Sequence, residues 1–217
     1  MQRRTLILTN GELLNKSALT VRIEKWNPDQ VIAANGGSRH APMLGLDIDL
    51  VVGDLDSIGA AQHQSLLSRG TQFEHFQAEK DETDLELALL RAVEQGATEI
   101  AIVGVVGDRL DMVMANILLL TQKMLVPVRV ELWLGHQTAW LIRPPGGEIT
   151  GKAGDTVSLI PLEGDAIGVS TTGLSYSLHG ERLFFGPARG VSNEMLEDVC
   201  HVDLEAGLLF AVHTKAS

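Results

Sequence analysis

The sequence has 217 residues, of which 45% are hydrophobic and 21% charged, an ordinary composition for a globular protein with a normal core. The formal net charge of −11 argues against broad, non-specific nucleic-acid binding, which needs a basic surface to displace counterions. The same charge is compatible with a phosphate ligand when a metal ion lies between the ligand and the protein.

No stretch approaches the roughly 18–20 consecutive apolar residues that a membrane span requires. The apolar run at residues 5–8 is too short for a signal peptide, so we expect a cytoplasmic protein without a membrane partner. A single cysteine cannot form an intrachain disulfide, and we interpret Cys200 as a small buried hydrophobic residue. The seven histidines show no metal-ligand spacing, which argues against zinc.

Mostly apolar runs alternate with helical patterns through the first part of the chain. Such runs are typical of strands that are buried on both faces of a parallel sheet. The predicted strands are residues 5–8, 31–34, 48–52, 100–103 and 128–134. Strand alternating with helix predicts an α/β layer structure with right-handed crossovers.

Three helices are predicted between these strands. The capping box Thr83-Asp84-Leu85-Glu86 marks the start of one, apolar residues follow at helical spacing, and Gly96 marks its end. A second helix is expected to begin near residues 108–111. One side of it would be lined by Leu110, Val113, Met114, Ile117, Leu118 and Thr121. Residues 58–68 form a weaker third pattern that Gly70 closes.

The pattern changes near residue 136. Short β-like runs at residues 156–160, 166–170, 175–178 and 208–212 are separated by frequent glycines, which favours a small β-sandwich or barrel. We therefore predict two domains, an α/β domain at residues 1–136 and an all-β domain at residues 137–217.

Four polar clusters follow the predicted strands or begin the helices beyond them, at the sheet edge where open α/β sheets bind ligands. The first is Asn35-Gly36-Gly37, which allows a close backbone approach to a ligand or simply a turn. The second is Gly53-Asp54-Leu55-Asp56-Ser57. If this segment is extended, Asp54 and Asp56 point the same way and suit Mg²⁺. A solvated loop, or a helix cap made by Asp56 or Ser57, is an equal alternative.

The third cluster is Lys80-Asp81-Glu82-Thr83-Asp84, whose acids could hold a metal and whose Lys80 or Thr83 could bind phosphate at a helix start. The fourth runs from Gly104 through Gly107 and Arg109 to Asp111, with Asn116 one turn later, and would cradle phosphate. A charged capping loop and an ordinary glycine turn are the respective alternatives. Together the four clusters indicate metal-bridged nucleotide phosphates and a charge-stabilised transfer.

On these motifs the sequence resembles the thiamine pyrophosphokinase family. The resemblance includes the four clusters in order, then residues 172–178 and Ser192-Asn193-Glu194 near the end. It implies an α/β nucleotide-binding catalytic half and a β-sandwich half that act as a homodimer, with thiamine lying between subunits. The implied reaction is attack of the thiamine hydroxyl on the β-phosphorus of ATP, with AMP leaving.

The resemblance also implies roles for individual residues. Asp54, Asp56, Asp81 and Asp84 would be catalytic, and Mg²⁺ would be bound by Asp54, Asp56 and Asp81. Ser192 and Asn193 would face the pyrimidine ring of thiamine. The nucleotide would be bound by Asn35, Gly36, Gly37, Ser57, Lys80, Thr83, Gly107, Arg109, Asp111 and Asn116.

Two positions depart from the family pattern. Asn35 stands where the family commonly has aspartate, and Met112 stands where it usually has histidine, which bears on nucleotide preference more than on reaction class. Three rival functions remain from the sequence: an aspartate-nucleophile phosphatase, a pyrophosphokinase that acts on a pterin alcohol, and a non-catalytic nucleotide sensor. The phosphatase is disfavoured because its Asp-x-Asp motif usually follows the first strand, whereas here it follows the third predicted strand.

Overall fold

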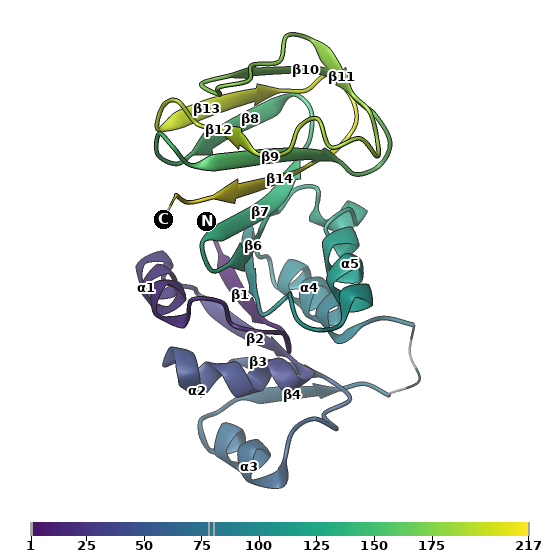
Figure 1. Ribbon diagram of the computed structural model, residues 1–217. Helices are drawn as coiled ribbons and strands as arrows, with labels where there is room; N and C mark the ends of the chain where they lie inside the picture. The colour runs from purple at the N-terminus through teal and green to yellow at the C-terminus, as the bar shows by residue number, and fades with distance from the viewer. Residues whose placement is uncertain (1, 78, 80, 217) are drawn as a thin grey trace. The chain divides into compact units, whose positions relative to one another are not determined.

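The computed structural model describes residues 2–77, 79 and 81–216, which form two compact units, one that ends at Gly135 and one that begins at His136 (Figure 1). The N-terminal unit is built on a parallel sheet with the strand order β6-β5-β1-β2-β3-β4. Its strands are β1 (Arg4–Leu8), β2 (Gln30–Ala34), β3 (Leu50–Gly53), β4 (Gln72–His75), β5 (Glu99–Val103) and β6 (Arg129–Leu134). All five strands predicted for this unit are present, and β4 was missed because its side chains are not fully buried.

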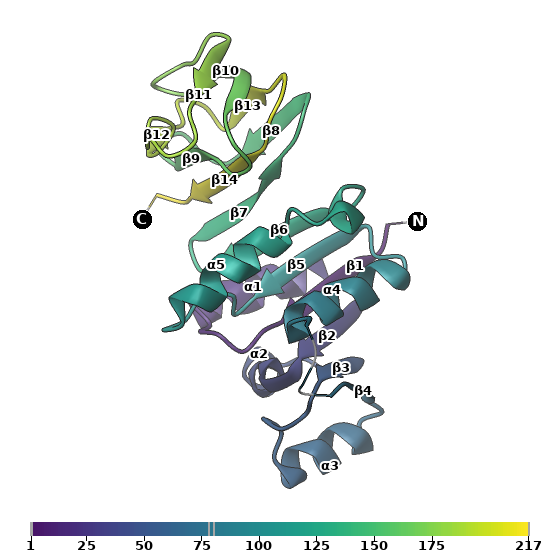
Figure 2. The ribbon, with the colours of Figure 1, turned by 90° about the vertical axis from the view of Figure 1, so that its right-hand side faces the viewer.

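Helices cover both faces of this sheet. In Figure 2, α4 (Asp84–Glu94) and α5 (Leu110–Leu119) lie in front of the strands and α1 (Lys16–Trp26) lies behind them. On the face of α1, Leu19 and Ile23 pack in one cluster with Leu6 of β1, and α2 (Ala41–Leu44) and α3 (Ala60–Ser68) add to the same cluster. Two 3₁₀ helices complete the unit, η1 (Asn35–His40) and η2 (Lys123–Leu125).

Helix α4 forms where the capping box predicts it. The hydroxyl of Thr83 accepts a hydrogen bond from the backbone amide of Glu86 at 3.2 Å, which satisfies one of the unpaired amides of the first turn. The side chain of Glu86 accepts a hydrogen bond from Gln122 at 2.5 Å. Helix α1 was not predicted, because only Leu19 and Ile23 of its eleven residues are buried and its apolar pattern is correspondingly weak.

The side of α5 that contains Leu110, Met114 and Leu118 is not its buried side. Leu110 is 74% exposed, and Met114 and Leu118 are each 48% exposed. Asn116 is instead the one residue of α5 that is buried. No helix in the described part of the chain is long and apolar enough to cross a membrane.

The C-terminal unit contains two antiparallel sheets with the orders β12-β9-β14-β7 and β11-β10-β13-β8. Its strands are β7 (Gln137–Ile142), β8 (Gly146–Thr150), β9 (Thr156–Pro161), β10 (Ala166–Thr172), β11 (Glu181–Leu183), β12 (Asn193–Glu194), β13 (Val199–Asp203) and β14 (Leu209–Thr214). One buried cluster takes side chains from both sheets, including Leu159 and Leu209 from the first and Val169 and Val202 from the second. The unit is therefore a β-sandwich, and the predicted fold class is confirmed.

The sandwich contains Cys200 and residues 175–178, for which the sequence predicts a buried packing residue and a strand. Cys200 is fully buried, and burial raises the pKa of its thiol to about 11, so it is a packing residue. Residues 175–178 do not form the predicted strand. They belong to a turn in which the Ser177 hydroxyl donates to the Leu174 carbonyl at 3.1 Å and the Leu178 amide donates to the Thr171 hydroxyl at 2.9 Å.

A buried polar contact holds the end of β14 against the turn before β9. One carboxylate oxygen of Asp155 lies 2.8 Å from Nε2 of His213 and also accepts the backbone amide of Lys152 at 2.9 Å. Its other oxygen accepts the backbone amide of Ala216 at 2.8 Å. Burial acts to raise the pKa of Asp155, but these hydrogen bonds outweigh it and the pKa lies below its ordinary value.

Candidate functional site

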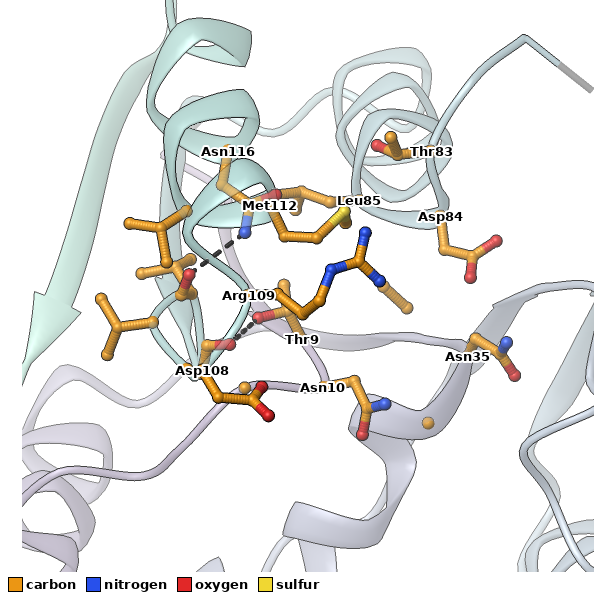
Figure 3. Close-up of a pocket in the computed structure, with 18 residues that line it drawn as sticks. Thr9, Asn10, Asn35, Thr83, Asp84, Leu85, Asp108, Arg109, Met112 and Asn116 are labelled. Carbon is orange, nitrogen blue, oxygen red and sulfur yellow. Dashed lines mark hydrogen bonds between the residues drawn. The ribbon is translucent and has the colours of Figure 1, made fainter.

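A cavity of about 320 Å³ lies at the carboxyl edge of the parallel sheet (Figure 3). The sheet order changes direction at β1, which has β2 on one side and β5 on the other. Open α/β sheets bind ligands at such a switch point. The lining comes from residues 9–11, 34–36, 83–85 and 104–109, together with Met112, Val113 and Asn116 of α5.

The loop after β1 is a part of the site that the sequence analysis did not identify. Gly11 donates its amide to the Gly104 carbonyl at 2.7 Å, and Glu12 donates to the Val106 carbonyl at 2.7 Å. A Cβ atom at Gly11 would lie 2.2 Å from both carbonyl oxygens, so no larger residue fits. In the sequence, Asn10-Gly11 has the form of a turn, and its place directly after the first strand is the sign that could have pointed to this loop.

Helix η1 fixes this loop from the other side. Arg39 donates to the Asn10 carbonyl at 2.8 Å, and Nε2 of His40 lies 2.9 Å from the Gly11 carbonyl. Burial is the main cause that lowers the pKa of His40, so its ring is neutral near pH 7 and Nε2 carries the proton that this carbonyl accepts. These contacts fix the floor of the cavity before any ligand binds.

The carboxylates of Asp54 and Asp56 converge on the amide of Asn35. Nδ2 of Asn35 donates to Oδ1 of Asp54 at 2.7 Å and to Oδ1 of Asp56 at 3.2 Å. The segment is not extended, because Leu55 has a φ of 62°. The two carboxylates are thus brought together by a turn. The Asn35 hydrogen bond is the main cause that lowers the pKa of Asp56, so this carboxylate is ionised.

The oxygen groups around Asn35 suit a magnesium ion. Carboxylate and amide oxygens are the ligands this ion prefers, with water and substrate phosphate completing its shell. Oδ1 of Asn35 is buried and, within the described part of the chain, has no hydrogen-bond partner. The described residues contain no group of three or more acidic, histidine or cysteine side chains that could hold a metal.

Asp84 and Thr83 bring the start of α4 to the same place. Gly53 has a φ of 146°, and a Cβ there would lie 2.8 Å from Cβ of Asn35 and 3.0 Å from Oδ1 of Asp84. Only glycine allows this approach of the β3 end to both side chains. The amino end of α4, capped by Thr83, adds the positive end of a helix dipole to the cavity wall.

Arg109 and Asp111 form an exposed ion pair. Nε of Arg109 donates to Oδ1 of Asp111 at 2.9 Å, and the two side chains are 68% and 64% exposed. The hydrogen bond from Arg109 is the main cause that lowers the pKa of Asp111 to about 2. Arg109 lines the cavity and Asp111 does not. Asn116 lies on the buried side of α5 and also lines the cavity.

The structure gathers part of the predicted set. Asn35, Gly36, Thr83, Asp84, Gly107, Arg109 and Asn116 line the cavity. The predicted residues that do not line it are Gly37, Asp54, Asp56, Ser57, Asp81 and Asp111. Asp54 and Asp56 remain tied to it through Asn35, while Asp81 is exposed. A Cβ at Gly37 would lie 2.1 Å from the Leu8 carbonyl, so this glycine serves backbone packing. Lys80 lies outside the described residues.

The C-terminal unit has a cavity of about 370 Å³ that includes Tyr176, Arg189 and Asn193. Asn193 is engaged with the backbone: its Oδ1 accepts the Tyr176 amide at 2.9 Å and its Nδ2 donates to the Tyr176 carbonyl at 2.7 Å. Ser192 has a φ of 61° and donates its amide to the Ser158 hydroxyl at 3.0 Å. Asn193 therefore fixes the turn that presents Tyr176.

The fold and the site define a class: a ligand-binding α/β domain with a polar cavity at its switch point, followed by a β-sandwich domain. Residues 24–132 match the family model described as thiamin pyrophosphokinase, catalytic domain, and residues 147–209 match the one described as thiamin pyrophosphokinase, vitamin B1 binding domain. The chain belongs to the thiamin pyrophosphokinase family of enzymes.

Individual relatives agree with this assignment. The chain is 29% identical to a thiamine pyrophosphokinase of Bacillus subtilis over 164 residues, which are 75% of this chain and 76% of that protein. The crystal structure of a Bacillus subtilis thiamine pyrophosphokinase matches with a TM-score of 0.86 at 22% identity, covering 99% of this chain and 100% of the other. A thiamin pyrophosphokinase family protein of Enterococcus faecalis matches with a TM-score of 0.84 at 22% identity, covering both chains fully, at 100% each. At these identities the two structures support the fold alone.

Proposed function

We propose that this enzyme transfers the pyrophosphoryl group of ATP to the hydroxyl of thiamine, in a reaction that depends on Mg²⁺ and yields thiamine diphosphate and AMP. The observation that carries the proposal is the match of both units to the two thiamin pyrophosphokinase family models, with a polar cavity at the switch point of the first. The bond between the hydroxyl oxygen and the β-phosphorus forms, the bridge to the α-phosphorus breaks, and AMP leaves with that electron pair while the hydroxyl proton is released.

We assign the metal to the carboxylates that share Asn35. Asp54 and Asp56 would bind Mg²⁺, with Asp81 as a further ligand and Asp84 beside them. When bound, the ion would neutralise charge on the phosphates. The proposal is supported by the convergence of the two carboxylates on one amide nitrogen, at 2.7 and 3.2 Å. It is also supported by the low pKa of Asp56, which keeps that carboxylate ionised.

The phosphates would lie along the loops of the cavity. The helix-α4 amino end at Thr83 and the guanidinium of Arg109 supply positive charge there, with Gly36 and Gly107 allowing backbone approach. Asp111 would act through its ion pair with Arg109. Gly37, Ser57 and Lys80 stay in the proposed nucleotide set on the family resemblance alone.

Thiamine would be bound through Ser192 and Asn193 of the sandwich. For Asn193 the contacts favour an indirect role, since its amide holds the backbone of Tyr176 at both ends. We also propose a cytoplasmic homodimer. The apolar side chains that α5 exposes, Leu110, Met114 and Leu118, support a surface that a second copy covers. Light scattering at micromolar concentration would test this, and a monomer would contradict it.

The test uses purified protein with thiamine, ATP and Mg²⁺, and measures AMP and thiamine diphosphate. One AMP for each thiamine diphosphate is expected. Turnover of a pterin alcohol but not of thiamine would show that the acceptor is wrong. Release of inorganic phosphate alone would favour a phosphatase, although the Asp-x-Asp motif follows β3, the third strand along the chain. Binding of ATP without any AMP would indicate a sensor.

A matched pair of variants tests the metal assignment. Asp56→Asn should abolish turnover while the protein stays folded, because it removes the ionised carboxylate. Asp47→Asn makes the same charge change at a surface residue that is paired with Arg69 at 3.3 Å, and should leave turnover unchanged. An active Asp56→Asn enzyme would remove the metal role that we assign to this residue.

A further inference from the structure

Asn116 places a buried oxygen acceptor in the wall of the nucleotide cavity. Its side chain is 6% exposed, and its Nδ2 donates to the Val105 carbonyl at 3.2 Å. A carbonyl oxygen only accepts, so the amide nitrogen must face Val105 and Oδ1 must be the other end of the amide. Within the described part of the chain, this Oδ1 has no hydrogen-bond partner.

A buried acceptor without a partner is unfavourable, because it has lost its hydrogen bonds to water and has formed none within the protein. Asn116 is held in place by its bond to Val105, so the oxygen cannot turn away to solve this without breaking that bond. This oxygen has almost no accessible surface in the free protein, so a ligand group that donates a hydrogen bond would satisfy it once a neighbouring side chain moves aside. The cavity wall therefore selects for a donor at this position.

The surroundings of Asn116 indicate which part of a ligand lies there. Leu85, Met112 and Val113 line the same cavity and present apolar surface. Figure 3 shows Asn116 and Met112 on one side of the cavity, with Asp84 and Asn35 on the other. The acidic end suits metal-bound phosphates, and the apolar end suits a flat, weakly polar ring.

We propose that Oδ1 of Asn116 accepts a hydrogen bond from the exocyclic amino group of the donor base, and so selects a 6-aminopurine over a 6-oxopurine. This inference rests on the proposed function, in which the donor is a nucleoside triphosphate. A 6-oxo group would bring a second acceptor against Oδ1 and leave both oxygens unpaired. Met112 offers no donor or acceptor of comparable strength at this end, so Asn116 carries the discrimination.

The test compares direct binding of ATP and inosine triphosphate by calorimetry with Mg²⁺ and without thiamine. These nucleotides differ at position 6 of the purine, where an amino group is replaced by an oxo group. The wild-type protein should bind ATP about tenfold more tightly or better, the scale of one hydrogen bond gained and one buried acceptor left unpaired. Equal affinities would overturn the proposal, as would a preference for inosine triphosphate.

Variants then assign the preference to Asn116. Asn116→Leu should bind both nucleotides with affinities within about twofold of each other, because no polar group would then face position 6 of the base. Thr121→Ala is the control, since its hydroxyl donates only to the Leu118 carbonyl, at 2.9 Å, near the end of the same helix. If Asn116→Leu binds with the wild-type preference, Asn116 is not the selecting residue. If this variant does not fold, equal affinities of the wild-type protein for the two nucleotides would still refute the proposal.

The outcome is separable from that of the proposed function. Thiamine diphosphate formed equally well from both nucleotides, with equal binding, would leave the function standing and refute the role of Asn116. An ATP preference that Asn116→Leu removes, without any thiamine diphosphate, would do the reverse. A loss of affinity for 2′-deoxy-ATP combined with equal binding of ATP and inosine triphosphate would place a ribose hydroxyl on Oδ1, and would also refute the proposal.

Discussion

Replacing Asn35 by aspartate should tighten binding of a divalent cation at Asp54 and Asp56. In the native protein, Nδ2 of Asn35 lies between the two carboxylates and donates a hydrogen bond to Oδ1 of Asp54 at 2.7 Å and to Oδ1 of Asp56 at 3.2 Å. Aspartate at this position removes that donor and adds a third carboxylate. Repulsion among the three acids would then be relieved by a cation between them.

The size of the effect follows from one added charge. A unit charge about 4 Å from a divalent cation gains roughly 2 kcal/mol at the dielectric constant of water, which corresponds to about a 30-fold rise in affinity. Mn²⁺ serves as the probe, and its free concentration is followed by electron paramagnetic resonance without nucleotide. Raising the ionic strength should reduce the gain, because the site is partly open to solvent.

Asn27→Asp is the matched control, since it makes the same charge change at the end of α1. Its Mn²⁺ affinity should equal that of the wild type. If Asn35→Asp binds Mn²⁺ no more tightly than Asn27→Asp, the cation does not lie at the carboxylates that Asn35 joins, and the metal assignment fails.

Two further predictions concern polar pairs of opposite burial. Asp155→Ala should lower the free energy of unfolding by about 3–5 kcal/mol, because it leaves the buried ring nitrogen of His213 and the backbone amide of Ala216 without their partner. Since the folded pKa of Asp155 lies below its unfolded value, its contribution is present above about pH 4–5 and is lost as the pH falls. Denaturant titrations at pH 7 and pH 3 check this, and an equal loss at both would contradict it. Asp111→Asn should change the KM for ATP by less than about threefold, because exposed pairs contribute little, whereas Arg109→Gln should raise it about tenfold or more. Steady-state kinetics would measure both KM values, and an equal rise in the two variants would contradict this prediction.

The sheet was predictable because its strands are buried on both faces. Continuous apolar runs cover residues 31–34 and 100–103. A central strand of a parallel sheet is buried on both faces, so its sequence is apolar at every position and does not alternate with polar residues. Helix α4 was equally accessible, because Thr83 and Gly96 mark its ends locally. The buried side of α5 was not predictable, because the helix is largely apolar all round and its sequence pattern does not show which side is buried.

The site was predictable only to the level of the sheet edge. Thr83, Arg109 and Asn116 reach the cavity because chain order places them after β4 and β5. Thr9 to Gly11 were missed, since their role depends on the pairing of β1 with β5, which is a non-local fact. The convergence of Asp54 and Asp56 was expected from an extended strand, yet it comes from a turn at Leu55 and an amide from a different loop. No local pattern carries that information.

Transfer of label from ATP to thiamine tests the central claim most directly. The enzyme is incubated with thiamine, Mg²⁺ and ATP labelled separately on the β- and γ-phosphates, and the products are separated. The account predicts that both labels appear in thiamine diphosphate in equal amounts, with unlabelled AMP as the other product. Label in thiamine monophosphate with ADP, or in inorganic phosphate alone, would contradict pyrophosphoryl transfer.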